Sequence, residues 1–301
     1  MSKSHDIRFD TGALEKIVYE PHWVLDNEEE FWGGYPAQRY TRDWARAVNY
    51  EIDYGDWRRR VEEWSRLPEE ERRVSSLLRI TDTVVGARGR FMRDAVPHIL
   101  GYLPEATVLD VGVYFIAFIR PRAFAKGEIV FNVAATYWKG NPDNILNTMV
   151  HEVFHAGYSY WLGDDEDRSL QEKILRNIHS EGSATYAAYT ARHLFPAPDD
   201  KDFQMLEDPG TVRKHLSQVN TILRAASEKP EAEVEKMMWD VGVIGRAFYT
   251  VGAHMCRVIE EDLGRDALVS TFKSGPAAFT ELYNGATTPS LRLNPSPRGT
   301  S

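Results

Sequence analysis

The segment His151-Glu152-Val153-Phe154-His155 carries the residues of this sequence best suited to bind a metal ion. Two histidines four positions apart lie above one another on one face of an α-helix, so both rings can reach one ion. Zinc binds such imidazole nitrogens at about 2.0–2.1 Å. Glu152 follows the first histidine, where its carboxylate can take a proton from a metal-bound water without ligating the ion. The spacing therefore predicts a metal site with an adjacent general base.

The surroundings of this motif favour a metal site. An apolar helix would not place His, Glu and His on one stripe without compensating bonds. The apolar residues of the segment are Ile145, Leu146, Met149, Val150, Val153 and Phe154. Two other readings stay open: an exposed helix with an ordinary histidine pair, and a buried network satisfied by other side chains.

A catalytic zinc site needs a third protein ligand and an open fourth position. Glu181 is our candidate, because it follows His155 by 26 residues, enough for a helix end, a loop and a returning helix. Small neighbours would let two helix backbones approach closely, which a carboxylate ligand requires. These neighbours are Gly182, Ser183, Ala184, Ala187 and Ala188. A helix built only for tight packing is the alternative, and His179 is a rival ligand that would point elsewhere on a helix.

Other zinc-binding patterns are excluded. The form HExxHxxGxxH is absent, because Tyr158 and Trp161 occupy its last two key positions, so a three-histidine metzincin site is ruled out. The single cysteine, Cys256, rules out a disulfide within the chain and a structural zinc site built on cysteines.

The metal-binding segment has the start of a well-formed helix. Asn141 suits the N-cap, Pro142 the first helical position, and Asp143 complements the positive end of the helix dipole. We expect this helix over residues 142–161, with Gly163 near its end. Further helices are predicted over residues 56–67, 69–100 (as one helix or two), 169–194, 211–227, 231–238 and 239–263.

Two segments rich in β-branched and aromatic residues, 106–119 and 128–138, predict strands that could form a hairpin. The chain therefore reads as an α+β protein, mostly helical, with a small sheet beside the metal-binding helix. We expect an aromatic-rich helical part over residues 1–105, a catalytic part over 106–285 and a flexible tail over 286–301, which is rich in Pro, Ser and Thr. Trp57 and Trp64 are assigned to the core.

Composition excludes several classes of protein. Of 301 residues 43% are hydrophobic and 27% charged, which excludes disorder of the whole chain. The net charge of −9 offers no basic field for nucleic acid or anionic lipid. The longest apolar run, residues 111–119, is too short to span a bilayer, and the first ten residues lack a secretory apolar region, so a cytoplasmic location is expected. The acidic run at residues 164–167 is read as a solvated turn, since it lacks the spacing of a calcium loop.

These motifs resemble the gluzincin group of zinc metallopeptidases. The segment Glu181-Gly-Ser-Ala-Thr-Tyr186 is similar to the Glu-Gly-x-Ala-x-Tyr form of bacterial gluzincin-like peptidases of uncharacterised families, and residues 249–260, 264–268 and 279–284 look like their carboxy-terminal helices. The similarity covers about residues 128–284. It departs from the thermolysin pattern, in which Asn precedes the ligand Glu and a Ser-Asp pair follows, whereas here Ser180 precedes Glu181 and Thr185 lies four residues on.

The resemblance implies a zincin-like fold with a peptide-binding strand. Residues 131–134 would form an edge strand above the metal-binding helix, although a strand that only covers the core fits as well. Hydrolysis also needs a hydrogen-bond donor for the developing oxyanion. Tyr249 is our candidate, because Gly245, Gly252 and Cys256 share its side of the helix and leave room around its ring. A tyrosine packed in the core is the alternative, and His254 is the second candidate donor.

The function predicted from the sequence is hydrolysis of a peptide or amide bond with one zinc ion per chain. Its ligands would be His151, His155 and Glu181, and Glu152 would deprotonate the zinc-bound water. The same two histidines and carboxylate could instead form the facial triad of a non-haem Fe(II) tailoring enzyme, although such an enzyme does not need Glu152. A metal-stabilised binding module without turnover is the second alternative. We expect a peptide or amide substrate and neither nucleic acid nor membrane as a partner.

Overall fold

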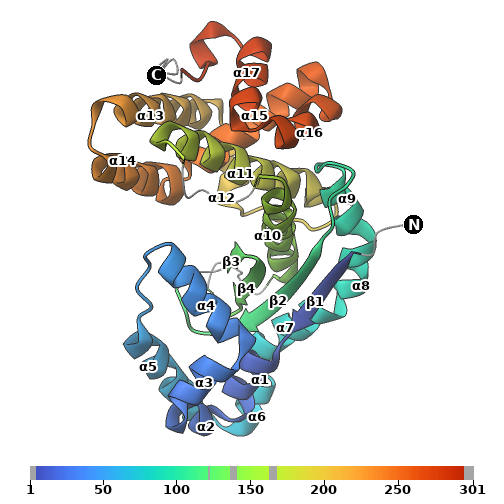
Figure 1. Cartoon of the computed structure of the whole chain (residues 1–301). Helices are drawn as coiled ribbons and strands as arrows, with labels where there is room; N and C mark the ends of the chain where they lie inside the picture. The colour runs from blue at the N-terminus through green and yellow to red at the C-terminus, as the bar shows by residue number, and fades with distance from the viewer. Residues whose placement is uncertain (1–4, 121–122, 136–140, 163–167, 295–301) are drawn as a thin grey trace. The chain divides into compact units, whose positions relative to one another are not determined.

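The structure is a computed structural model that describes residues 5–120, 123–135, 141–162 and 168–294 (Figure 1). The chain divides into two compact units, one of Met1–Pro97 and Val108–Ala156, the other of His98–Thr107 and Gly157–Ser301. These bounds differ from the division at residue 105 that composition suggests. The acidic run at residues 164–167 lies outside the described residues.

The first unit combines short helices with a small sheet. In chain order its elements are β1 (Asp6–Asp10), α1 (Gly12–Tyr19), α2 (Pro21–Asp26), α3 (Glu28–Gly34), α4 (Pro36–Ala47), α5 (Tyr54–Ser65), α6 (Glu69–Arg73), α7 (Ser76–Gly86), α8 (Arg88–Arg90), the π-helix η1 (Phe91–Ala95), β2 (Asp110–Ile116), β3 (Ala123–Lys126) and β4 (Glu128–Asn132). Helices α9 (Val96–Leu100) and α10 (Pro142–Leu162) each begin in this unit and end in the other. An α+β fold that is mostly helical with a small sheet is thereby confirmed.

The four strands lie in the order β1-β2-β4-β3 (Figure 1). Strand β2 pairs in parallel with both β1 and β4, and only β3 and β4 are antiparallel. The two predicted strands exist, but the predicted hairpin between them is wrong. The connection forms a strand of its own, β3, which turns into β4 at Gly127, and the positive φ of 74° there suits glycine.

The end of β4 is held by its neighbours. The Oδ1 atom of Asn132 accepts hydrogen bonds from the backbone N–H groups of Phe118 and Ala134, and its amide nitrogen donates to the carbonyl of Ile119. In the strand order given above, β4 lies between β2 and β3 and is not an edge strand. The prediction that residues 131–134 form the edge is wrong, because β3 occupies that side.

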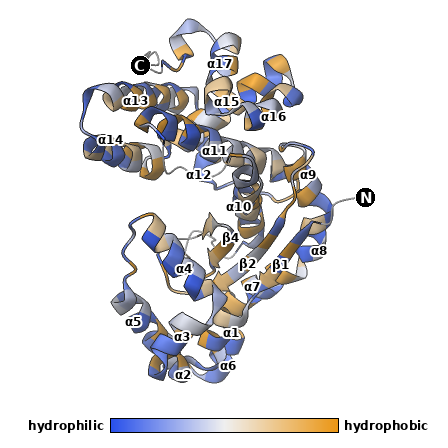
Figure 2. Cartoon of the chain, viewed as in Figure 1, coloured by the Kyte–Doolittle hydropathy of each residue, from blue (hydrophilic) through white to orange (hydrophobic). Residues whose placement is uncertain are grey.

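The core of the first unit lies around the sheet and among the aromatic residues of the short helices. Figure 2 shows β2 and β4 coloured mainly as hydrophobic, and α1 and α4 contact the sheet. Trp57 is buried and stacks on Phe31 with ring centroids 5.8 Å apart, which confirms it as a core residue. Trp64 is half-buried, 5.9 Å from the ring of Phe118.

The second unit is helical in its described residues. Its elements after α10 are α11 (Leu170–Thr190), η3 (Ala191–His193), α12 (Lys201–Glu207), α13 (Pro209–Glu228), α14 (Glu231–Met237), the π-helix η4 (Met238–Ile244), α15 (Ala247–Leu263), α16 (Arg265–Ser274), α17 (Pro276–Ala286) and η5 (Pro289–Leu291). Four of the predicted helices agree closely with α10, α11, α13 and α14. The continuous helix predicted over residues 239–263 is wrong, because the chain breaks before α15 at Arg246, whose φ is 64°.

The last described residues are bonded to the second unit. Tyr283 Oη donates to the carbonyl of Leu291, and the side chain of Asn284 bonds both backbone groups of Leu293, whose side chain is buried. This contact falls in a segment that the sequence predicts to be flexible. Within the described ranges, none of the helices combines the length and the apolar character needed to cross a bilayer.

Candidate metal centre

Helix α10 presents the two histidines on one stripe. It begins where Asn141 Oδ1 accepts a hydrogen bond from the backbone of Asp143 at 3.0 Å, and its apolar residues from Ile145 to Phe154 are fully or almost fully buried. His151, Glu152 and His155 are half-buried and therefore accessible to a ligand. Burial of these apolar residues fixes the position of the three polar residues on α10. This arrangement favours a metal site over an exposed helix with an ordinary histidine pair.

The histidine rings converge on one point. Their Nε2 atoms are 3.0 Å apart and their ring centroids 4.7 Å apart. Two nitrogens bound at about 2.0–2.1 Å in a tetrahedral site are separated by roughly 3.3 Å. The spacing of the two nitrogens in His151 and His155 is therefore close to that of ligands on one ion.

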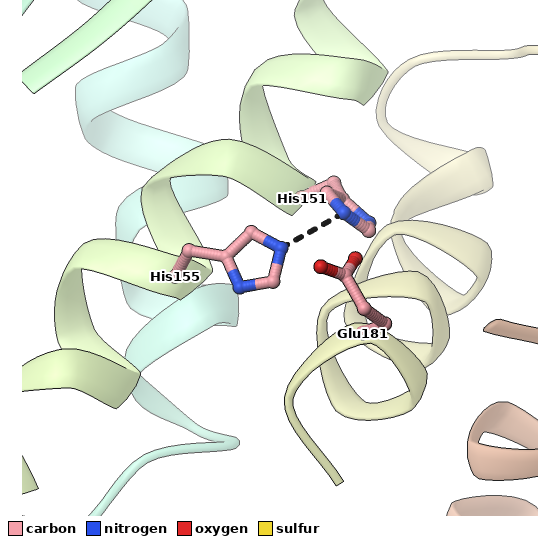
Figure 3. A group of neighbouring side chains, drawn as sticks. All are labelled: His151, His155 and Glu181. Atoms are coloured by element: carbon pink, nitrogen blue, oxygen red, sulfur yellow. Dashed lines mark hydrogen bonds between the residues drawn. The ribbon is translucent and has the colours of Figure 1, made fainter. Parts of the chain in front are cut away.

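Glu181 completes the group. It lies in the middle of α11, and Figure 3 shows its carboxylate directed toward the two rings. One possible ligand atom from each of His151, His155 and Glu181 lies within 4.8 Å of the other two. In the described parts of the chain, no other set of three or more His, Cys, Asp or Glu side chains meets this condition. These three residues could hold a metal ion, as two imidazoles and a carboxylate do in zinc sites.

His179 does not belong to the group. Its ring is fully buried and stacks against Phe272 and Phe279, with centroids 4.8 and 4.4 Å away. Its ring nitrogens lie 3.4 Å from Tyr158 Oη and 3.0 Å from Thr271 Oγ1. Burial, and after it the charge of Arg176, lowers the pKa of this imidazole to about 3. His179 is therefore a neutral core residue, as expected for a side chain on another face of α11.

The small residues after Glu181 serve a different helix pair from the one predicted. A Cβ atom on Gly252 would lie 2.0 Å from the carbonyl oxygen of Ile178, and one on Gly182 would lie 2.2 Å from Gly252 Cα. Helices α11 and α15 therefore pack backbone against backbone. The expected close approach of two helices exists, but it joins the Glu181 helix to the Tyr249 helix.

Tyr249 lies at the start of α15, on the side that faces α11. It is 8% exposed and belongs to the buried residues of the core, which agrees with the alternative that Tyr249 is a packed core tyrosine. Gly252 and Cys256 share its side, but α11 fills the space beside them: Cys256 Sγ lies 3.4 Å from Ser183 Oγ. The predicted free room around the ring is therefore occupied in part by α11.

His254 points elsewhere. Five residues separate it from Tyr249, which is about 140° around a helix. Its ring lies 5.9 Å from that of Tyr283, and its Nδ1 atom is 3.3 Å from Arg257. Burial lowers the pKa of His254 to about 4, and Arg257 adds to the effect. The neutral ring faces α17, which weakens its claim as the alternative oxyanion donor.

Arg246 and Asp202 form a pair that the sequence does not predict. The guanidinium donates from Nε and Nη2 to the two carboxylate oxygens at 2.8 and 2.5 Å, and its carbon lies 3.1 Å from the centre of the Tyr249 ring. Burial acts to lower the pKa of Arg246, but the charges of Asp202, Tyr249 and Glu181 raise it above its usual value. No local pattern signals a pair of residues 44 positions apart.

Comparison with known proteins gives one match. The model of a family described as "Putative zinc dependent peptidase (DUF5700)" matches residues 34–289. Neither the curated proteins nor the solved structures contain a match.

Proposed function

The chain belongs to the DUF5700 family, and on this premise we propose that it is a zinc-dependent peptidase of the gluzincin type. The observation that carries the proposal is the group of His151, His155 and Glu181, whose possible ligand atoms lie within 4.8 Å of one another. Two imidazoles and one carboxylate are a ligand set of catalytic zinc sites, and zinc held by them would supply Lewis-acid chemistry there. One zinc ion per chain is part of the proposal.

The protein's own groups would move the protons. Glu152, one residue after His151 and half-buried, is assigned as the base that accepts a proton from the attacking water and returns it to the leaving amine. Tyr249 is assigned as the donor of a hydrogen bond to the developing oxyanion. The substrate class is a peptide or another amide.

The test separates the base from the ligand. Glu152→Gln keeps the side-chain shape but cannot accept a proton at neutral pH. We expect its zinc content to stay near that of the wild type, while hydrolysis of a mixed peptide library falls on the order of 10²–10⁴-fold. Glu181→Gln is the matched change, and it should lose zinc because a neutral amide is a poor ligand.

Each result has a clear reading. Loss of zinc by Glu152→Gln with retention by Glu181→Gln would overturn the assigned roles. Protein purified without added metal identifies the ion, and stoichiometric iron there would favour the Fe(II) alternative. Full zinc occupancy with no hydrolysis of any library peptide would favour the binding module.

A further inference from the structure

We propose that Arg246 is a positioning residue of the peptidase, which holds the Tyr249 ring in place through a partly buried ion pair with Asp202. The inference rests on the proposed function, and it adds to that function the residues that make Tyr249 a pre-organised donor. All the contacts that carry it lie within the second unit.

The ion pair is built for orientation. Both of its hydrogen bonds are parallel bonds from one edge of the guanidinium to one carboxylate, a geometry that fixes the plane of the guanidinium. The Asp202 side chain is 9% exposed and that of Arg246 is 23% exposed, so water competes little for these bonds. Asp202 is itself fixed, because its backbone N–H donates to the Asp200 side chain that caps α12. The Asp202 carboxylate of α12 thus fixes the plane of the Arg246 guanidinium.

The backbone of Arg246 is strained. Its φ of 64° and ψ of 17° lie in the left-handed region, which costs a residue with a Cβ roughly 1–2 kcal/mol. Such strain persists only where the surroundings impose it, and it is concentrated at functional sites. A glycine at position 246 would adopt this conformation without the strain. The glycine of this turn stands instead one position earlier, at Gly245. An arginine in the strained place therefore indicates that its side chain is needed there.

That side chain covers the Tyr249 ring. The guanidinium carbon lies 3.1 Å from the ring centre, so the ring cannot turn without moving the ion pair. Glu181 belongs to the same charge environment, since its carboxylate is among the groups that interact with Arg246. The cation thus fixes the orientation of the proposed donor. A misplacement of about 1 Å of a catalytic group can cost 10²-fold in rate.

The primary experiment compares Arg246→Met in two backgrounds. In the wild-type background we expect kcat to fall on the order of 10- to 100-fold, with KM changed by less than about threefold and zinc content unchanged. In the Tyr249→Phe background the same substitution should have little further effect, because the hydroxyl group that Arg246 positions is already absent. Arg246→Lys, which keeps the charge without the two-pronged bond, should recover only part of the activity.

A merely structural role would give a different pattern. Equal loss of kcat from Arg246→Met in both backgrounds would overturn the proposal. Because Arg246→Met leaves Asp202 buried without its cation, the double variant Arg246→Met/Asp202→Asn removes both charges together and is the safer folding control. It should show the same dependence on Tyr249.

The chain offers a matched control in the same unit. Arg192 also stacks on a tyrosine, with its guanidinium carbon 3.6 Å from the Tyr189 ring centre, and it also pairs with a carboxylate, Glu207, at 2.8 Å. This second stack is more exposed, with 35% of the Arg192 side chain accessible, and contains none of the proposed site residues. Arg192→Met should leave kcat unchanged.

A measurement that needs no turnover keeps the two proposals separable. With 3-fluorotyrosine incorporated, the ¹⁹F resonance assigned by Tyr249→Phe should be single and narrow. Arg246→Met should shift it toward its position in denatured protein, whereas Arg192→Met should not. An unchanged resonance would overturn the positioning role even if the protein is a peptidase. If Arg246→Met shifts the resonance but the protein cleaves no peptide, the contact between Arg246 and Tyr249 is supported and the proposal that the protein is a peptidase fails.

Discussion

The two histidines of α10 do at the residue scale what their four-residue spacing predicts, since their Nε2 atoms meet 3.0 Å apart. His155→Ala removes one of three proposed ligands, and the remaining His151 and Glu181 no longer form a complete chelate. We expect both metal binding and hydrolysis to be abolished. Zinc titration monitored by calorimetry checks this, and stoichiometric zinc of unchanged affinity would place the site elsewhere.

His254 makes stability depend on pH. Its folded-state pKa of about 4 lies below the usual value of 6.5, so between these values the unfolded chain binds more protons. Its contribution is fully present above about pH 6.5 and is lost as the pH falls toward 4. At pH 5 this single group costs about 2 kcal/mol relative to pH 7.

The matched measurement is the free energy of unfolding by urea at pH 7 and at pH 5. His254→Leu should lose less stability than the wild type over this step, because the leucine takes up no proton. His22→Leu, at an exposed position, controls for the removal of a histidine. Equal acid sensitivity of the wild type and His254→Leu would show that His254 is not the responsible group.

At the scale of elements, α11 and α15 depend on their glycine contact. Gly252→Ala would place a Cβ 2.0 Å from the Ile178 carbonyl and 2.6 Å from Gly182 Cα, both backbone atoms that cannot move aside cheaply. Overpacking of this kind costs about 1–3 kcal/mol, more than the roughly 1 kcal/mol that alanine gains in helix propensity. Separation of the two helices would also move Glu181 relative to Tyr249.

We therefore expect Gly252→Ala to lower the melting temperature and to reduce zinc affinity together. Gly285→Ala is the control in α17, since its Cβ would meet nothing within 4 Å, and it should leave stability unchanged or slightly raised. Melting curves with and without zinc distinguish the two variants. A Gly252→Ala protein as stable as the wild type would show that the two helices can separate at little cost.

For the whole molecule, a bound metal must add stability if it binds only the folded chain. At a free zinc concentration of 100 times Kd, this contribution is about 2.7 kcal/mol. Chelation should therefore lower the melting temperature of the wild type and leave that of His155→Ala unchanged. If chelation destabilises both proteins equally, the metal responsible is bound outside His151, His155 and Glu181.

The sequence by itself determined which side chains could bind a metal together and the elements that carry most of them. A histidine pair at helical spacing, a capped helix start and an apolar remainder are local properties, and they reappear in α10 with nearly the predicted bounds. Glu181, which the sequence indicates as the third ligand, lies in the structure with a carboxylate oxygen within 4.8 Å of a ring nitrogen of each histidine. Periodicity and capping depend on neighbours within a few positions, so they can be read without the fold.

Only the tertiary structure decided how distant segments pair. It made β2 and β4 parallel, placed β3 at the edge, packed the small residues of α11 against α15, and broke the helix before Ala247. It also brought Asp202 to Arg246 across 44 residues. The physical reason is that the parallel pairing of β2 and β4, the packing of α11 on α15 and the pair of Arg246 and Asp202 are contacts between segments far apart in the chain. The energy of such a contact depends on the packing of both segments and leaves no periodic pattern in either.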